Sequence, residues 1–225
     1  MSNPRPIAEA VRDLPVGLSV FPATPADVPA ITALIRAVDI AGCGHSSSNE
    51  AEVHDDLGGR DCGWDHGAAV VRRGAPPGGD GLGAPGGDLV GALIVRDGLA
   101  EGRGWDVDVY VAPGDPDEAA VAARLVTAGV AQGAARWDGT GAVPVAASAC
   151  FANDAVLRRV LEAEGFQEVR RFWRMIRAHH TGEAAAPPAP PAGCTIRAVA
   201  GEADLRTLHE VGLAGNRADG AAGWG

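Results

Sequence analysis

Lysine is absent from this 225-residue sequence, and all 19 of its basic residues are arginines. Acidic residues outnumber them at 29, so the formal net charge is −10, and no basic cluster interrupts this excess. Nucleic acids and anionic membranes repel a surface of this charge. We therefore expect neither a nucleic acid nor a membrane as a partner.

Long apolar runs and a cysteine framework are also missing. No segment has membrane-spanning length, and residues 1–15 lack the apolar stretch of a signal peptide. The four cysteines are widely scattered, without the spacing of a disulfide-stapled domain. These absences predict a reduced, cytoplasmic protein, and they leave its oligomeric state open.

Strand and helix patterns alternate along most of the chain. Thr24-Pro25-Ala26-Asp27 supplies an N-cap, a first-turn proline and an acidic residue, and apolar residues then recur at helical spacing. Residues 105–111 alternate strictly, which places Asp106, Asp108 and Tyr110 on one face of a strand. We predict strands over residues 18–21, 68–72, 89–95, 105–111, 143–149, 166–169 and 171–177, and helices over 25–41, 48–57, 116–136 and 153–165.

Composition divides the chain into four parts. Residues 1–17 are expected to be a leader, residues 18–180 a mixed α/β domain, and residues 181–193 a Pro/Ala-rich linker. In residues 194–225 the pattern of the first strand and helix returns, with an apolar run at 195–199 and a helical stripe of Leu205, Leu208 and Val211. This tail is predicted to be the first strand and helix of an incomplete second domain, with residues 214–225 disordered.

The order of these elements and three local motifs resemble the GNAT N-acetyltransferase superfamily. WDVDVYVAP (105–113) resembles its fourth strand, NDAVLRRVLEAEGF (153–166) its late helix, and RRFWRM (170–175) the closing strand of tandem proteins of the mycothiol synthase type. The resemblance implies an α/β fold with a mixed sheet and splayed central strands. It also implies acyl transfer from acetyl-CoA to an amine of a small molecule or peptide.

Candidate site residues follow from this resemblance. The backbone of Val109, Tyr110 and Val111 would bind the pantetheine arm, and the start of the next helix would bind the pyrophosphate, because free amides and the helix dipole favour anions there. Asp108 is the candidate general base, although alternation alone also places a polar residue there. Glu50 would bind the amine, or would only stabilise the first turn of its helix. The pyrophosphate residues would be Glu118, Ala119, Ala120 and Ala122.

Two features depart from the family pattern. Ala and Val stand where the phosphate loop has glycines, and Asp115, Asp117 and Glu118 bring carboxylates to the position that phosphate would occupy. Leu161 stands where family members often have a tyrosine that protonates the leaving thiolate. The alternative to an N-acyltransferase is therefore a catalytically degenerate module of the same fold, with a structural, regulatory or ligand-binding role.

Potential zinc ligands gather in one part of the sequence. Two cysteines and three histidines fall within 24 residues, but they lack the paired spacing that zinc sites use. We therefore predict no metal site from Cys43, His45, His54, Cys62 and His66.

Overall fold

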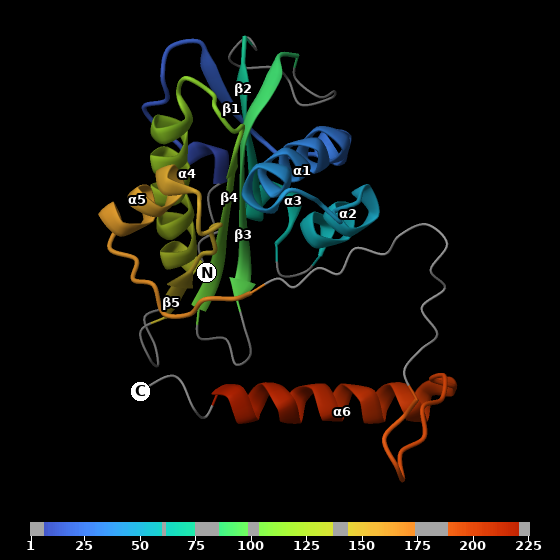
Figure 1. The fold of residues 1–225 in the computed structure, drawn as a ribbon. Coiled ribbons are helices and arrows are strands. Elements are labelled where there is room, and N and C mark those ends of the chain that lie inside the picture. Colours follow the sequence, from blue (N-terminus) through green and yellow to red (C-terminus); the bar gives the residue numbers. More distant parts are fainter. Residues whose placement is uncertain are drawn as a thin grey trace. The chain divides into compact units, whose positions relative to one another are not determined.

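The computed structural model describes residues 7–59, 62–74, 86–98, 104–136, 144–173 and 189–220. The chain forms two compact units, residues 1–171 and residues 172–225. The first unit is a layered α/β domain with helices on both faces of a sheet (Figure 1). The fold class predicted from the sequence is confirmed.

The sheet has five strands in the order β1-β2-β3-β4-β5. The pairs from β1 to β4 are antiparallel, and β4 and β5 are parallel. A parallel pair requires a crossover, and the helix between β4 and β5 supplies it. The bounds are β1 (Leu18–Pro22), β2 (Ala68–Arg73), β3 (Asp88–Gly98), β4 (Gly104–Val111) and β5 (Val145–Ala147).

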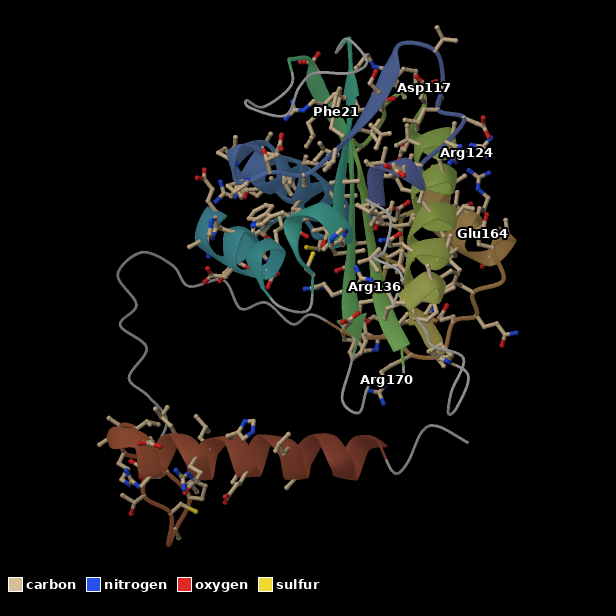
Figure 2. The ribbon with its side chains drawn as sticks, turned by 180° about the vertical axis from the view of Figure 1, so that it is seen from behind. Phe21, Asp117, Arg124, Arg136, Glu164 and Arg170 are labelled. Carbon is tan, nitrogen blue, oxygen red and sulfur yellow. The ribbon has the colours of Figure 1, made fainter. Side chains whose placement is uncertain are left out.

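One face of the sheet is covered by α4 (Glu118–Arg136) and α5 (Ala155–Ala163). The apolar stripe of α4, which includes Val121 and Leu125, packs on the valines of β4 to form the larger core. Ile7 of the short 3₁₀ helix η1 (Ile7–Glu9) and nearby Val11 are buried in the same core. Part of the segment expected as a leader is thus integral to this domain. Asp117 and Arg136 mark the two ends of α4 in Figure 2.

The opposite face is covered by α1 (Val28–Cys43), α2 (Glu50–Gly58) and the short α3 (Trp64–Gly67), which the sequence did not predict. The expected start of α1 is present as the 3₁₀ turn η2 (Pro25–Asp27). There the Asp27 carboxylate accepts from the backbone amide and hydroxyl of Thr24 and pairs with Arg72 of β2 at 2.6 Å. This buried ion pair fixes the entry of α1 against the sheet.

The region after α5 differs from the prediction. Residues 166–173 form no strand, and Val169 is 72% exposed; residues 174–177 of the other predicted strand lie outside the described part. The predicted fifth strand is reduced to the three residues of β5, and α5 begins at Ala155, with the Asp154 side chain as its N-cap, rather than at Asn153. A strand needs a paired neighbour, and alternation in the sequence cannot supply one.

The second unit contains the predicted helix but not the predicted strand. Residues 195–199 are neither strand nor helix, whereas α6 spans Gly201–Gly220. The helix therefore enters the stretch that was expected to be disordered. Residues 189–193 of the predicted linker also carry no helix or strand. Among the described residues, no helix is both long enough and apolar enough to cross a membrane.

Candidate functional site

The central strands β4 and β5 separate after a short contact. Their pairing joins Gly104 to Val145, Trp105 to Ala146 and Asp106 to Ala147, and it stops there. Beyond this point β4 continues to Val111, paired with β3 on its other side. Over residues 107–111 the edge of β4 that faces β5 is therefore free of strand pairing, as expected for splayed strands. Unpaired strand amides and carbonyls are available to a ligand.

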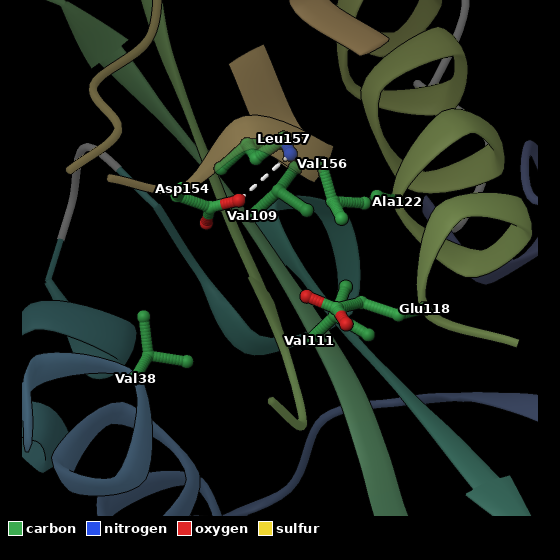
Figure 3. Close-up of a pocket in the computed structure, with 8 residues that line it drawn as sticks. All are labelled: Val38, Val109, Val111, Glu118, Ala122, Asp154, Val156 and Leu157. Atoms are coloured by element: carbon green, nitrogen blue, oxygen red, sulfur yellow. Dashed lines mark hydrogen bonds between the residues drawn. The ribbon is translucent and has the colours of Figure 1, made fainter. Parts of the chain in front are cut away.

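A small pocket lies at this opening (Figure 3). It is bounded by β4, the first turns of α4, the start of α5 and one side of α1. Its cavity volume is about 20 Å³, room for about one water molecule. A longer ligand must therefore displace the surrounding side chains. The lining residues are Val38, Val109, Val111, Glu118, Ala122, Asp154, Val156 and Leu157.

Four of the residues expected to bind the cofactor line this pocket: Val109, Val111, Glu118 and Ala122. The other three, Tyr110, Ala119 and Ala120, lie outside it. Ala119 lines the neighbouring groove between α4 and α5, and Ala120 is exposed. Tyr110 points to the other face of the sheet, where burial raises the pKa of its hydroxyl. Glu50 is exposed in the first turn of α2 and does not line the pocket.

The loop before α4 is held by its own carboxylates. Asp115 accepts from the backbone amide of Asp117 at 2.8 Å, and Glu118 accepts from the amide of Gly114 at 3.2 Å. Arg73, at the end of β2, contacts both Asp115 and Asp117, at 2.8 and 3.0 Å. Hydrogen bonds to these two carboxylates raise the pKa of Arg73. The amides of Gly114 and Asp117 and the Arg73 guanidinium are thus engaged within the protein.

Asp108 lies on the face of the sheet opposite the pocket's valines. Its side chain is 18% exposed, and Oδ2 pairs with Arg96 of β3. Burial raises the pKa of the Asp108 carboxyl, and the Arg96 charge counteracts part of this effect. Arg96 also reaches Asp56 of α2 at 3.5 Å. Within the described part of the chain, Oδ1 of Asp108 is left free to accept a proton.

Leu161 is a core residue in this structure. It is buried on the inner face of α5, in the cluster that also contains Val121 and Leu125 of α4. An apolar side chain here packs the two helices together and has no proton to donate. Leu161, which replaces the tyrosine often found in the family, therefore contributes to the core and does not act as a proton donor.

The potential zinc ligands remain dispersed. Cys43 and His45 are neighbours, with Sγ and Nδ1 3.5 Å apart. Cys62 is buried elsewhere, and burial raises the pKa of its thiol to about 11, which disfavours a metal-binding thiolate. The part of the chain that the structure describes contains no group of three or more side chains suited to a metal ion.

Several contacts at the site had no signal in the sequence. The pairs Arg73–Asp115 and Arg73–Asp117 join residues 42 and 44 positions apart. Phe151, just before α5, packs so closely on α1 that a Cβ at Gly42 would lie 2.3 Å from its ring. The side chain of Asn153 donates to the carbonyl of Ala41 at 3.2 Å. The end of α1 is thereby attached to the start of α5, across the pocket.

Comparison with known proteins places this geometry in a structural class. No family model and no curated protein matches the chain. Among solved structures, a GCN5-related N-acetyltransferase from Sphaerobacter thermophilus has a TM-score of 0.57 at 23% identity over 70% of this chain. The fold is that of the GCN5-related N-acetyltransferases. The chain spans 46% of the length of that protein.

Two further solved structures are less similar to this chain. An acetyltransferase from Thermus thermophilus has a TM-score of 0.44 at 17% identity, covering 68% of this chain and 88% of that one. The aminoglycoside N-acetyltransferase AAC(6')-Iy, solved in complex with CoA, has a TM-score of 0.42 at 11% identity, covering 71% of this chain and 94% of that one.

Proposed function

We propose that this protein is an N-acyltransferase that transfers an acyl group from a thioester donor to an amine of a small molecule or peptide. The observation that carries the proposal is the free edge of β4 at residues 107–111, which borders a pocket at the start of α4. An extended amide-containing arm can pair with such an edge as an added strand would. The fold similarity supports the same activity.

The residues around the pocket suit one part of acetyl-CoA. Val109, Val111 and Ala122 offer apolar contacts, and the β4 backbone offers hydrogen bonds, so a pantetheine arm would find matching groups here once it displaces the surrounding side chains. The nucleotide end fits poorly, because carboxylates already occupy the loop amides. Acetyl-CoA is the donor implied by the resemblance, and only its arm has a matching surface.

Asp108 is the residue we assign to proton transfer. Its free Oδ1 would accept the proton of the attacking amine, directly or through water, while Arg96 holds Oδ2 and orients the carboxylate. The raised pKa makes it a stronger base than an ordinary aspartate. Arg96 acts here as a positioning residue.

An acetyl-transfer assay tests the proposal. Wild-type protein, Asp108→Asn and the control Asp55→Asn, an exposed carboxylate on α2, are incubated with acetyl thioesters and a panel of small amines and peptides. Thiol release that depends on an amine in wild type and control, and falls in Asp108→Asn, supports the assignment. Absence of amine-dependent release with every donor would contradict it.

A second candidate function is a non-catalytic module of the same fold. The occupied loop amides and the buried Leu161 favour it. It predicts weak or absent acetyl-CoA binding and no transfer. Calorimetric titration with acetyl-CoA, of the wild type and of Asp117→Arg/Ala120→Gly, tests this weak binding. The double variant restores a cation and a glycine to the loop and should bind more tightly. Low-micromolar acetyl-CoA binding by the wild type, independent of salt, would contradict the weak binding that the occupied loop amides predict.

A further inference from the structure

The loop before α4 also carries information about the donor, provided that the proposed acyl transfer is correct. We propose that the acyl donor is the thioester of a pantetheine-like thiol that carries no nucleotide pyrophosphate. The protein's own carboxylates take the place of the phosphates. The specificity-determining residues are Asp117 and Glu118, supported by Asp115.

The loop amides of Gly114 and Asp117 already donate to carboxylates of the protein. A helix N-terminus binds an anion through its unpaired amides. Here Asp115 Oδ1 accepts a hydrogen bond from the backbone amide of Asp117 at 2.8 Å, and Glu118 Oε2 accepts one from the amide of Gly114 at 3.2 Å. A pyrophosphate would have to displace carboxylates that are tethered to the same loop. Two ionised groups would then compete for one set of donors.

The charge of the loop opposes phosphate as well. Three carboxylates face one guanidinium, because Arg73 is the one cation that the structure places in contact with Asp115 or Asp117 among the described residues. Its Nη2 donates to both of these side chains, and no described cation pairs with Glu118 beside the pocket. The pocket contains a further carboxylate, Asp154, which caps α5 through the amide of Leu157 at 2.8 Å. An anionic ligand would meet net repulsion at this end of the site.

The remainder of the pocket lining suits an uncharged chain that displaces the surrounding side chains. Val109, Val111 and Val156 form its apolar walls, and the free edge of β4 supplies amide and carbonyl groups. A pantetheine arm consists of an alkyl chain with two amides, which matches this combination. The site thus retains the surface for the arm and lacks the one for the nucleotide.

The experiment uses a series of donors that share the acetylated arm and gain negative charge at its far end: S-acetyl-pantetheine, S-acetyl-4'-phosphopantetheine and acetyl-CoA. Affinity for the full chain is measured by ligand-observed NMR at low and high salt. We expect the affinity at low salt to fall along the series, by at least about tenfold from first to last. The gap should narrow between about 0.01 M salt, where the screening length is about 30 Å, and about 1 M, where it is about 3 Å.

Neutral variants separate the loop from the rest of the site. Asp117→Asn/Glu118→Gln keeps the side-chain shapes and removes two charges, and Glu52→Gln removes a first-turn carboxylate from α2 as the matched control. The double variant should bind acetyl-CoA about tenfold more tightly at low salt, with S-acetyl-pantetheine unchanged. The control should bind all three donors as the wild type does.

The outcomes distinguish this inference from the proposed function. Acetyl-CoA binding most tightly of the three donors, with the double variant unchanged, would overturn the inference and leave acyl transfer intact. Failure of every thioester to bind both wild type and double variant would overturn the proposed function and the inference with it. The wild-type salt series needs no substitution, so its result stands even if the double variant fails to fold.

Discussion

Asp108 illustrates how much a residue's chemistry depends on its packing. The alternating strand showed that Asp106 and Asp108 face the same way, but it could not show which one is buried or paired. In the structure Asp108 is largely enclosed and held by Arg96, and burial raises its pKa. A carboxylate in these surroundings accepts a proton more readily than an exposed one.

The pH dependence of transfer follows from this environment. The basic form of Asp108 is lost as the pH falls through its raised pKa, so the acid limb of kcat/KM should lie at a higher pH than for an ordinary aspartate. Asp108→Asn should lower kcat by about 100-fold or more and should remove this limb. Rate measurements across the acidic range test both. An unchanged acid limb in Asp108→Asn would assign it to another group.

At the scale of elements, α4 packs so close to the sheet that two of its contact positions have no room for a Cβ atom. A Cβ at Gly129 would lie 2.5 Å from Val107, and a Cβ at Gly133 would lie 2.1 Å from the Trp105 ring. Both glycines are buried on the inner face of the helix. They let α4 lie directly on β4, and this places the first turn of α4 at the pocket.

Alanine substitutions test this close approach. Gly129→Ala and Gly133→Ala should each lower the free energy of unfolding by about 1–3 kcal/mol, because the added methyl forces the helix away from the sheet. The control is Gly58→Ala at the end of α2, where the nearest atom would be 3.5 Å away. Urea unfolding monitored by circular dichroism gives the comparison. Equal stability of all three variants would mean that α4 packs more loosely than the structure shows.

The sequence predicted most helices and four of the five strands near their observed positions, because the helices repeat their apolar residues at a regular interval and the strands are short alternating or apolar runs. The prediction failed where strand pairing or a contact between distant residues decides the structure. Residues 166–169 and 171–173 were predicted to be strand but form none. The pairs of Arg73 with the loop and of Arg96 with Asp108 were equally hidden, since composition does not reveal which distant charges meet. The elements around the candidate pocket were therefore predictable, and its ion pairs were not.

At the scale of the whole molecule, the second unit lacks a core of its own among the described residues. Leu205, Leu208 and Val211 of α6 are 57%, 58% and 64% exposed. The helix begins with the Asp204 carboxylate accepting from the amide of Ala200 and pairing with Arg197. Within its own unit α6 gains few contacts to offset its ordering entropy, so we expect it to be marginally stable.

Hydrogen exchange measures the stability of α6 directly. At low protein concentration, amides of residues 201–213 should exchange far faster than those of β3 and α4, which lie in the core. Protection that appears only at high concentration would show that the apolar stripe covers itself by self-association. Strong protection at low concentration would contradict a marginal helix.

The central claim is that a thioester arm lies along the open edge of β4, next to the start of α4. The most direct test is a backbone NMR titration of the full chain with S-acetyl-pantetheine. The predicted result is saturable shifts at the amides of residues 107–111 and 119–122, with α2 and α6 unaffected. Shifts confined to other elements, or none at concentrations that saturate ligand-observed binding, would contradict the account.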